Sequence, residues 1–105
     1  MNKYSYPTEE DLKEVRKQGD FNTKKQVLSF LDFLESIWWM SEWGYKLTGK
    51  NVLRLELHTG GFSGNENIIA ELQKTWFWVI WWEKSTRGGH YYFRIPIKQF
   101  FKDVS

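Results

Sequence analysis

The segment from Leu53 to His58 constrains the fold of this chain most strongly. Leucine occupies positions 53, 55 and 57, and a polar side chain occupies each position between and after them. Successive side chains of a strand point to opposite faces, so this alternation predicts a strand that buries one face and leaves the other polar. The polar positions are Arg54, Glu56 and His58.

A glycine-rich loop and a helix are predicted directly after this strand. The loop, Thr59 to Glu66, contains three glycines, and Ser63 and Glu66 stand at the spacing of a capping box. A helix is therefore expected from about Gly64 to Lys74. Its inner face carries Ile68, Ile69 and Leu72.

The run from Trp76 to Trp82 is apolar at every position. Periodicity alone does not separate a buried helix from a strand covered on both faces, and the aromatic and β-branched content favours the strand. Residues 85–89 are interpreted as a turn. The returning strand then runs from His90 to Ile95 and is closed by Pro96, so a hairpin is predicted.

Two helices are expected before this region. The first follows Thr8 and an acidic turn and stops near Gly19. The second runs from about Thr23 to Trp43 after a cap at Asn22 or Asp20, and it should be the main core helix because most of its surface is apolar.

The sequence pattern indicates the roles of the remaining segments less clearly. Trp39 and Trp43 fall near its polar stripe and indicate an interface if they are exposed. Tyr45 to Lys50 is interpreted as a connection. At the end of the chain, a helical turn is expected to place Phe100 and Phe101 on the core.

Together these elements predict a single α+β domain over residues 1–105. It has two N-terminal helices, then a β-α-β-β arrangement, with a three-stranded sheet packed on the long helix. The preferred order places the third strand between the other two, which makes each neighbouring pair antiparallel. The first two strands then run parallel, so the glycine-rich loop and the hairpin turn lie at the same edge of the sheet.

Composition narrows the function. The chain has no cysteine, which excludes disulfides, thiolate nucleophiles and cysteine zinc sites. The net charge of +2 is too small to indicate nucleic-acid binding by itself, although the C-terminal end is locally basic. The N-terminus has no apolar signal region and no stretch is long enough to cross a membrane, so a cytoplasmic protein without a membrane partner is expected. The basic residues are Lys84, Arg87, Arg94, Lys98 and Lys102.

The candidate ligand-binding residues lie in the two loops and on the polar face of the sheet. Arg87 stands beside two glycines, where a hairpin does not require an arginine, and is an expected anchor for an anionic partner. The glycine-rich loop lacks the phosphate-binding signatures, and Glu66 would repel a phosphate, so its glycines could equally serve only a tight turn. The full set is Gly60, Gly61, Ser63, Asn65, Arg87, His90 and Tyr92.

His58, His90 and Glu66 are the candidate catalytic residues. Imidazole titrates near neutrality, so two histidines and a carboxylate, that of Glu66 or of Glu56, could perform acid–base chemistry. No short ligand spacing supports a metal, and neither a metal nor a cofactor is expected. The alternative is that both histidines are hydrogen-bonded structural residues.

The motif from Gly60 to Glu66, followed by the Trp-rich run and by residues 87–91 (RGGHY), resembles a pattern in small phage and prophage proteins of unknown function. The resemblance covers about residues 53–95 and implies a phage or prophage origin, and hence the host cytoplasm, but no activity.

The leading hypothesis is a binding module that recognises a host protein or a small polar or anionic ligand through the loop edge. An enzyme is the less favoured alternative, and it would use the histidine cluster. A nucleic-acid-binding protein is a further alternative, because aromatic side chains on a sheet can stack bases. A homodimer is also compatible with the wide apolar surface of the long helix.

Overall fold

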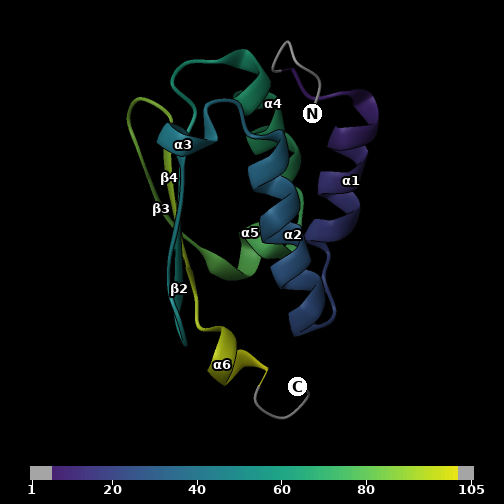
Figure 1. Cartoon of the computed structure of the whole chain (residues 1–105), viewed down its shortest axis with the longest axis vertical. Helices are drawn as coiled ribbons and strands as arrows, with labels where there is room; N and C mark the ends of the chain where they lie inside the picture. Colours follow the sequence, from purple (N-terminus) through teal and green to yellow (C-terminus); the bar gives the residue numbers. More distant parts are fainter. Residues whose placement is uncertain (1–5, 102–105) are drawn as a thin grey trace.

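The computed structural model describes residues 6–101 and arranges them as one open sheet with helices α1, α2, α4 and α5 on one side (Figure 1). This confirms the α+β class. The elements are α1 (Glu9–Gly19), α2 (Lys24–Ile37), α3 (Ser41–Gly44), β1 (Tyr45–Gly49), β2 (Leu53–His58), α4 (Ser63–Leu72), α5 (Trp76–Trp81), β3 (Trp82–Thr86), β4 (His90–Ile95) and α6 (Ile97–Phe100).

The sheet has four strands in the order β1-β2-β4-β3, and every neighbouring pair is antiparallel. Strand β4 lies between β2 and β3, so residues 90–95 are central as preferred, but their second neighbour is residues 82–86 and not the expected strand over 76–82. The expectation of three strands was wrong because Tyr45–Gly49 is a strand and not a connection. It pairs with β2 along its whole length, from Tyr45 opposite Leu57 to Gly49 opposite Leu53.

The long second helix expected over residues 23–43 is divided in two. Helix α2 ends at Ile37, Met40 adopts the left-handed conformation at φ 57°, and α3 begins at Ser41. The cap was also placed wrongly, because Thr23 is the N-cap. Its hydroxyl accepts a hydrogen bond from the Gln26 amide at 3.1 Å, and the Gln26 side chain accepts one from the Thr23 amide at 3.3 Å.

The Trp-rich run is a helix, α5, followed by strand β3, and the expected strand over residues 76–82 was wrong. Two side chains cap its first turn. The hydroxyl of Thr75 accepts a hydrogen bond from the Trp78 amide, and the carboxylate of Asp20 accepts one from the Trp76 amide at 3.0 Å. Helical spacing then buries Phe77 and Trp81. The opposite side of α5 is exposed at Trp76, Val79 and Ile80.

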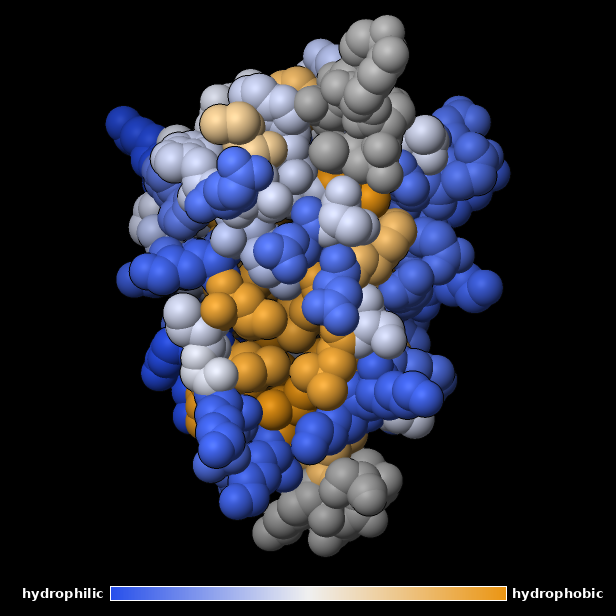
Figure 2. Space-filling model, viewed as in Figure 1, coloured by the Kyte–Doolittle hydropathy of each residue, from blue (hydrophilic) through white to orange (hydrophobic). Residues whose placement is uncertain are grey.

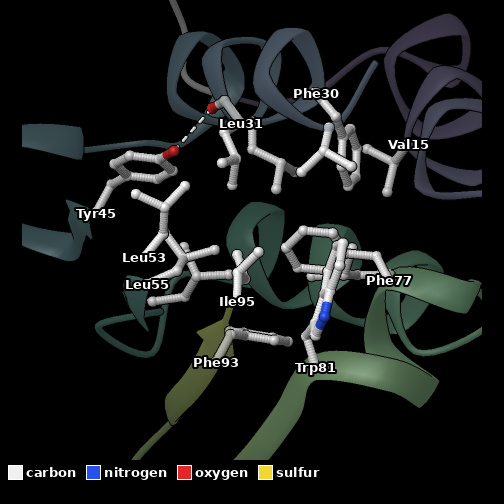
Figure 3. Packing of buried hydrophobic residues seen from close by; sticks show 14 of the residues in the cluster. Val15, Phe30, Leu31, Tyr45, Leu53, Leu55, Phe77, Trp81, Phe93 and Ile95 are labelled. Carbon is white, nitrogen blue, oxygen red and sulfur yellow. Dashed lines mark hydrogen bonds between the residues drawn. The ribbon is translucent and has the colours of Figure 1, made fainter. Parts of the chain in front are cut away.

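The core lies between the inner face of the sheet and the helices (Figure 3). Leu53, Leu55 and Leu57 of β2 are buried, as their alternation predicts. The expected inner face of α4, residues 68, 69 and 72, is buried as well. Of the two C-terminal phenylalanines, Phe101 is buried and Phe100 is 45% exposed. Lys102, assigned to the basic C-terminal end, lies outside the described residues.

The flank between the sheet and α2 is incompletely closed. Figure 2 shows apolar surface in the middle of this flank, framed by hydrophilic residues. Leu28 of α2 and Leu47 of β1 are exposed apolar side chains. The packing of α2 on the sheet therefore relies on contacts that lie deeper in the core.

Tyr45 joins the edge strand β1 to α2 within this core. Its hydroxyl donates a hydrogen bond to the carbonyl oxygen of Leu31 at 2.8 Å, which Figure 3 shows as a dashed line. Burial raises the pKa of Tyr45 well above the ordinary value of a tyrosine, and the carboxylates of Glu35 and Asp32 raise this pKa further. The folded protein therefore holds this phenol in its neutral, donating form.

We expect Tyr45→Phe to lower the free energy of unfolding at neutral pH by about 1 kcal/mol, because one buried hydrogen bond is lost. The pKa of Tyr45 is higher in the folded protein than in the unfolded chain, where it is about 10. The contribution of Tyr45 to the free energy of unfolding is therefore complete below about pH 10 and is lost as the pH rises above that value. Urea unfolding of both proteins from neutral to alkaline pH measures this. A stability difference that stays constant across about pH 10 would contradict the assignment.

Candidate functional site

The outer face of the sheet is the surface onto which the structure brings most of the polar residues of β2 and β4. Arg54 lies opposite Arg94, Glu56 opposite Tyr92, and His58 opposite His90. These are the positions that alternate with the more buried ones, so the polar faces of the two strands coincide. The helices α1, α2, α4 and α5 lie on the other side of the sheet (Figure 1).

The two edge strands extend this polar face. Strand β1 places Lys46 opposite Glu56 and Thr48 opposite Arg54. Strand β3 places Lys84 opposite Tyr92 and Thr86 opposite His90. A register shift between Trp82 and Lys84 brings Glu83 within 4.0 Å of Arg54. Both side chains of that ion pair are about half exposed, so it contributes little to stability.

His58 and His90 contact each other through their Nδ1 atoms, which are 2.6 Å apart. One Nδ1 must donate and the other accept, because two bare or two protonated nitrogens would repel. The Nε2 atom of His58 is also engaged, 3.3 Å from a carboxylate oxygen of Glu56. The two histidines are thus joined to each other and to Glu56, one of the two carboxylates considered for this cluster, and not to Glu66.

Aromatic rings continue from this histidine pair in two directions. The Tyr92 ring lies edge-on to His58 with a centroid separation of 6.0 Å, and the ammonium of Lys84 lies 5.0 Å from the Tyr92 ring centroid. On the other side, Trp43 lies 6.0 Å from His58 and is 55% exposed. Trp43 is therefore exposed, whereas Trp39 is partly covered by stacking on Phe62.

The glycine-rich loop and the hairpin turn lie side by side, as the topological argument predicted. The amide of Thr59 donates a hydrogen bond to the carbonyl oxygen of Gly89 at 2.9 Å. Gly89 has φ 82°, and a β-carbon there would collide with the Thr59 side chain, so glycine is needed for both backbone and space. No ion pair joins Arg87 to Glu66 among residues 6–101, and Arg87 remains exposed at the turn.

The N-terminus of α4 differs from the expected capping box. Phe62 is the N-cap residue and no side chain caps the helix, while Ser63 lies in the first turn with its hydroxyl 3.5 Å from that of Tyr6. Gly60 and Gly61 have positive φ values and form the tight turn. Ser63 stands one position too late in the chain to accept the capping bond, because the helix already begins there.

Asn65 is a structural residue. It is 1% exposed, its amide oxygen accepts a hydrogen bond from the Trp39 amide at 2.9 Å, and its amide nitrogen donates one to the Trp39 carbonyl at 3.1 Å. These two hydrogen bonds provide partners for the backbone amide and carbonyl of Trp39, just after α2 ends at Ile37. The side chain has no remaining surface with which to meet a ligand.

Glu66 is not part of the histidine cluster. No hydrogen bond or ion pair between Glu66 and either histidine is present in the described part of the chain. Within residues 6–101, no group of three or more His, Cys, Asp or Glu residues is placed to hold a metal ion. Nor is any described helix long and apolar enough to cross a membrane.

Two surface hollows lie beside α1, away from the sheet face. One of about 510 Å³ occupies the α1–α2 turn and includes Lys17, Phe21 and Lys25, and one of about 280 Å³ includes Leu12 and Glu71. None of the predicted site residues lines either hollow. The candidate residues that remain accessible therefore belong to an open face and not to either of these hollows.

Sequence reasoning missed part of this face. Lys46 and Thr48 were missed because β1 was read as a connection, although Tyr45 and Leu47 alternate with them. Lys84 was noted only as part of a basic segment, because the strand that carries it was placed too early. Arg54, noted as a polar position of its strand, and Arg94, noted as a basic residue, were both left out of the binding set.

Comparisons with models of protein families, with characterised proteins and with solved structures gave no match to this chain. The site is therefore interpreted from its own geometry.

We expect Asn65→Ala to destabilise the protein by about 2–3 kcal/mol, because it leaves the amide and the carbonyl of Trp39 without partners. Asn67→Ala is the matched control, since it makes the same change at an exposed position of the same helix. It should alter the free energy of unfolding by no more than about 0.5 kcal/mol. Equal effects of the two substitutions in urea unfolding would refute the structural role of Asn65.

Proposed function

We propose that this chain is a binding module that recognises an anionic partner on the outer face of its sheet. The observation that carries the proposal is the placement of Arg54 directly opposite Arg94 on the two central strands. Like charges opposite each other destabilise a sheet. An anion bound between the two guanidinium groups would turn this repulsion into attraction, because the planar donors of arginine suit phosphate and carboxylate groups.

The charges around this pair favour an anion as well. The outer positions of the four strands carry four cationic side chains, Lys46, Arg54, Lys84 and Arg94, and two carboxylates, Glu56 and Glu83. Both carboxylates already have partners, Glu83 in Arg54 and Glu56 in His58. Arg94 makes no ion pair within residues 6–101, so its charge is available to a ligand.

The loop edge adds to the same surface. Arg87 is exposed in the turn between β3 and β4, and that turn lies against the glycine-rich loop. A partner that extends along β4 from Arg94 would therefore reach Arg87 at the end of the strand. This supports recognition of an extended partner by the face and the edge together.

The enzyme alternative has less support. Both ring nitrogens of His58 are engaged, one by His90 and one by Glu56. Glu66, the expected third member, makes no hydrogen bond or ion pair with either ring within residues 6–101. Hydrogen bonding of this kind is typical of structural histidines. If the chain shares the phage or prophage origin that its sequence pattern indicates, the anionic partner is a molecule of the host.

We expect Arg94→Gln to weaken binding of inorganic polyphosphate at least tenfold while leaving stability unchanged or raised by up to about 1 kcal/mol, because it relieves the opposition to Arg54. Isothermal titration calorimetry at low salt measures the binding, and urea unfolding measures the stability. Lys13→Gln on α1 removes one exposed positive charge from the helical side and should change neither quantity.

The opposite pattern would overturn the proposal. An Arg94→Gln protein that unfolds more easily and binds polyphosphate as the parent does would make Arg94 a scaffold residue. Absence of polyphosphate binding by the parent protein would likewise remove the proposed function.

A further inference from the structure

We infer that the anionic partner is a single-stranded nucleic acid, whose phosphates meet the arginine pair while a base stacks on Tyr92. This inference rests on the proposed function and adds the class of ligand to it. It depends on the aromatic rings of the outer face, which recognition of a simple anion does not require.

Tyr92 has the position that base stacking needs. It lies on the central strand β4, in the middle of the outer row that runs from Lys46 through Glu56 to Lys84. The ammonium of Lys84 lies over its ring at 5.0 Å, so one side of the ring faces an exposed side chain and not the core. A base could take that place, leaving Lys84 free to contact the neighbouring phosphate.

Further rings extend the surface along the direction of β4. His58 lies next to Tyr92, and Trp43 next to His58, each at a centroid separation of 6.0 Å. Trp43 is more than half exposed. The histidine pair thus separates two accessible aromatic side chains, which provides stacking positions for more than one base.

The spacing of cationic and aromatic side chains along β4 suits the phosphate and the base of one nucleotide. Arg94, Tyr92 and His90 are successive outer positions of β4, and neighbouring outer positions of a strand are about 6.6–6.8 Å apart. One nucleotide can therefore place its phosphate at Arg94 and its base on Tyr92. A second phosphate can reach Lys84 or Arg87, which continue the positive surface toward the turn.

The combination selects a single strand among anionic partners. A duplex hides the faces of its bases, so it could use the cations but not Tyr92. A small anion or an acidic segment of a protein would likewise be held by the cations alone. Sequence-tolerant single-strand binding uses positive side chains and exposed aromatic rings together, which is what this face offers.

Fluorescence anisotropy with a labelled single-stranded oligonucleotide of about ten bases tests the inference directly. We expect Tyr92→Leu to weaken oligonucleotide binding about tenfold and to leave inorganic polyphosphate binding unchanged, because polyphosphate has no base. Trp76→Leu is the control, since it removes an exposed aromatic ring from α5, on the other side of the sheet. It should change neither affinity.

The salt dependence gives a second, independent readout. The slope of log affinity against log salt should become shallower by about 0.7 in Lys84→Gln and in Arg94→Gln, which each remove one phosphate contact. Lys13→Gln should keep the parent slope. A measured melting temperature for each variant shows that it is folded, so that a loss of binding is assigned to the face.

The outcomes separate this inference from the proposed function. Two results would overturn the single-strand inference: oligonucleotide binding that Tyr92→Leu leaves unchanged, or binding of a single strand that is no stronger than binding of a duplex. If polyphosphate binding still depends on Arg94, the anion-binding proposal stands. Failure to bind either polyphosphate or the oligonucleotide would overturn both.

Discussion

Burial of one face of the sheet is the constraint on which the rest of this structure depends. Side chains alternate between the two faces of β2 and β4, so covering Leu55, Leu57 and Phe93 with helices sends their neighbours to the opposite side. Helices α1, α2, α4 and α5 all lie on the covered side (Figure 1). The open face is thus a direct consequence of the core, and a one-residue shift in register would bury charge and expose leucine.

That constraint also explains which parts of the fold could be predicted. The strand over residues 53–58 and the inner face of α4 follow from short-range periodicity, and both were assigned correctly. The convergence of the two glycine loops followed from topology, since β2 and β3 are both antiparallel to β4. These features depend on patterns that lie within a few residues of one another or on general rules of chain connection.

The errors arose where distant contacts decide local structure. Residues 76–82 have strand-forming composition, yet the Thr75 hydroxyl and the carboxylate of Asp20, more than fifty residues away, cap them as helix α5. The break after α2 depends on Asn65 holding the backbone of Trp39 across 26 positions. The short edge strand β1 shows alternation over only four residues, and it was missed because so short a pattern does not distinguish a strand from a loop.

The residues of the two loops and of the outer face fall into two groups with different roles. Asn65, Gly89 and Thr59 hold the loops together, so their conformations and contacts are explained by the fold. Arg54, Arg94, Lys84 and Tyr92 occupy outer positions of the sheet, and like charges directly opposite each other, as at Arg54 and Arg94, disfavour strand pairing. These outer residues are the ones to which we propose a binding role.

The central claim is that the outer face of the sheet is the binding surface. Amide chemical-shift changes during titration of the ¹⁵N-labelled protein with inorganic polyphosphate test it most directly. The account predicts that the largest changes fall on outer positions of β2, β3 and β4, with Arg54 and Arg94 among them. Changes concentrated instead at the α1–α2 hollow around Lys17 and Lys25, with the sheet unaffected, would contradict it.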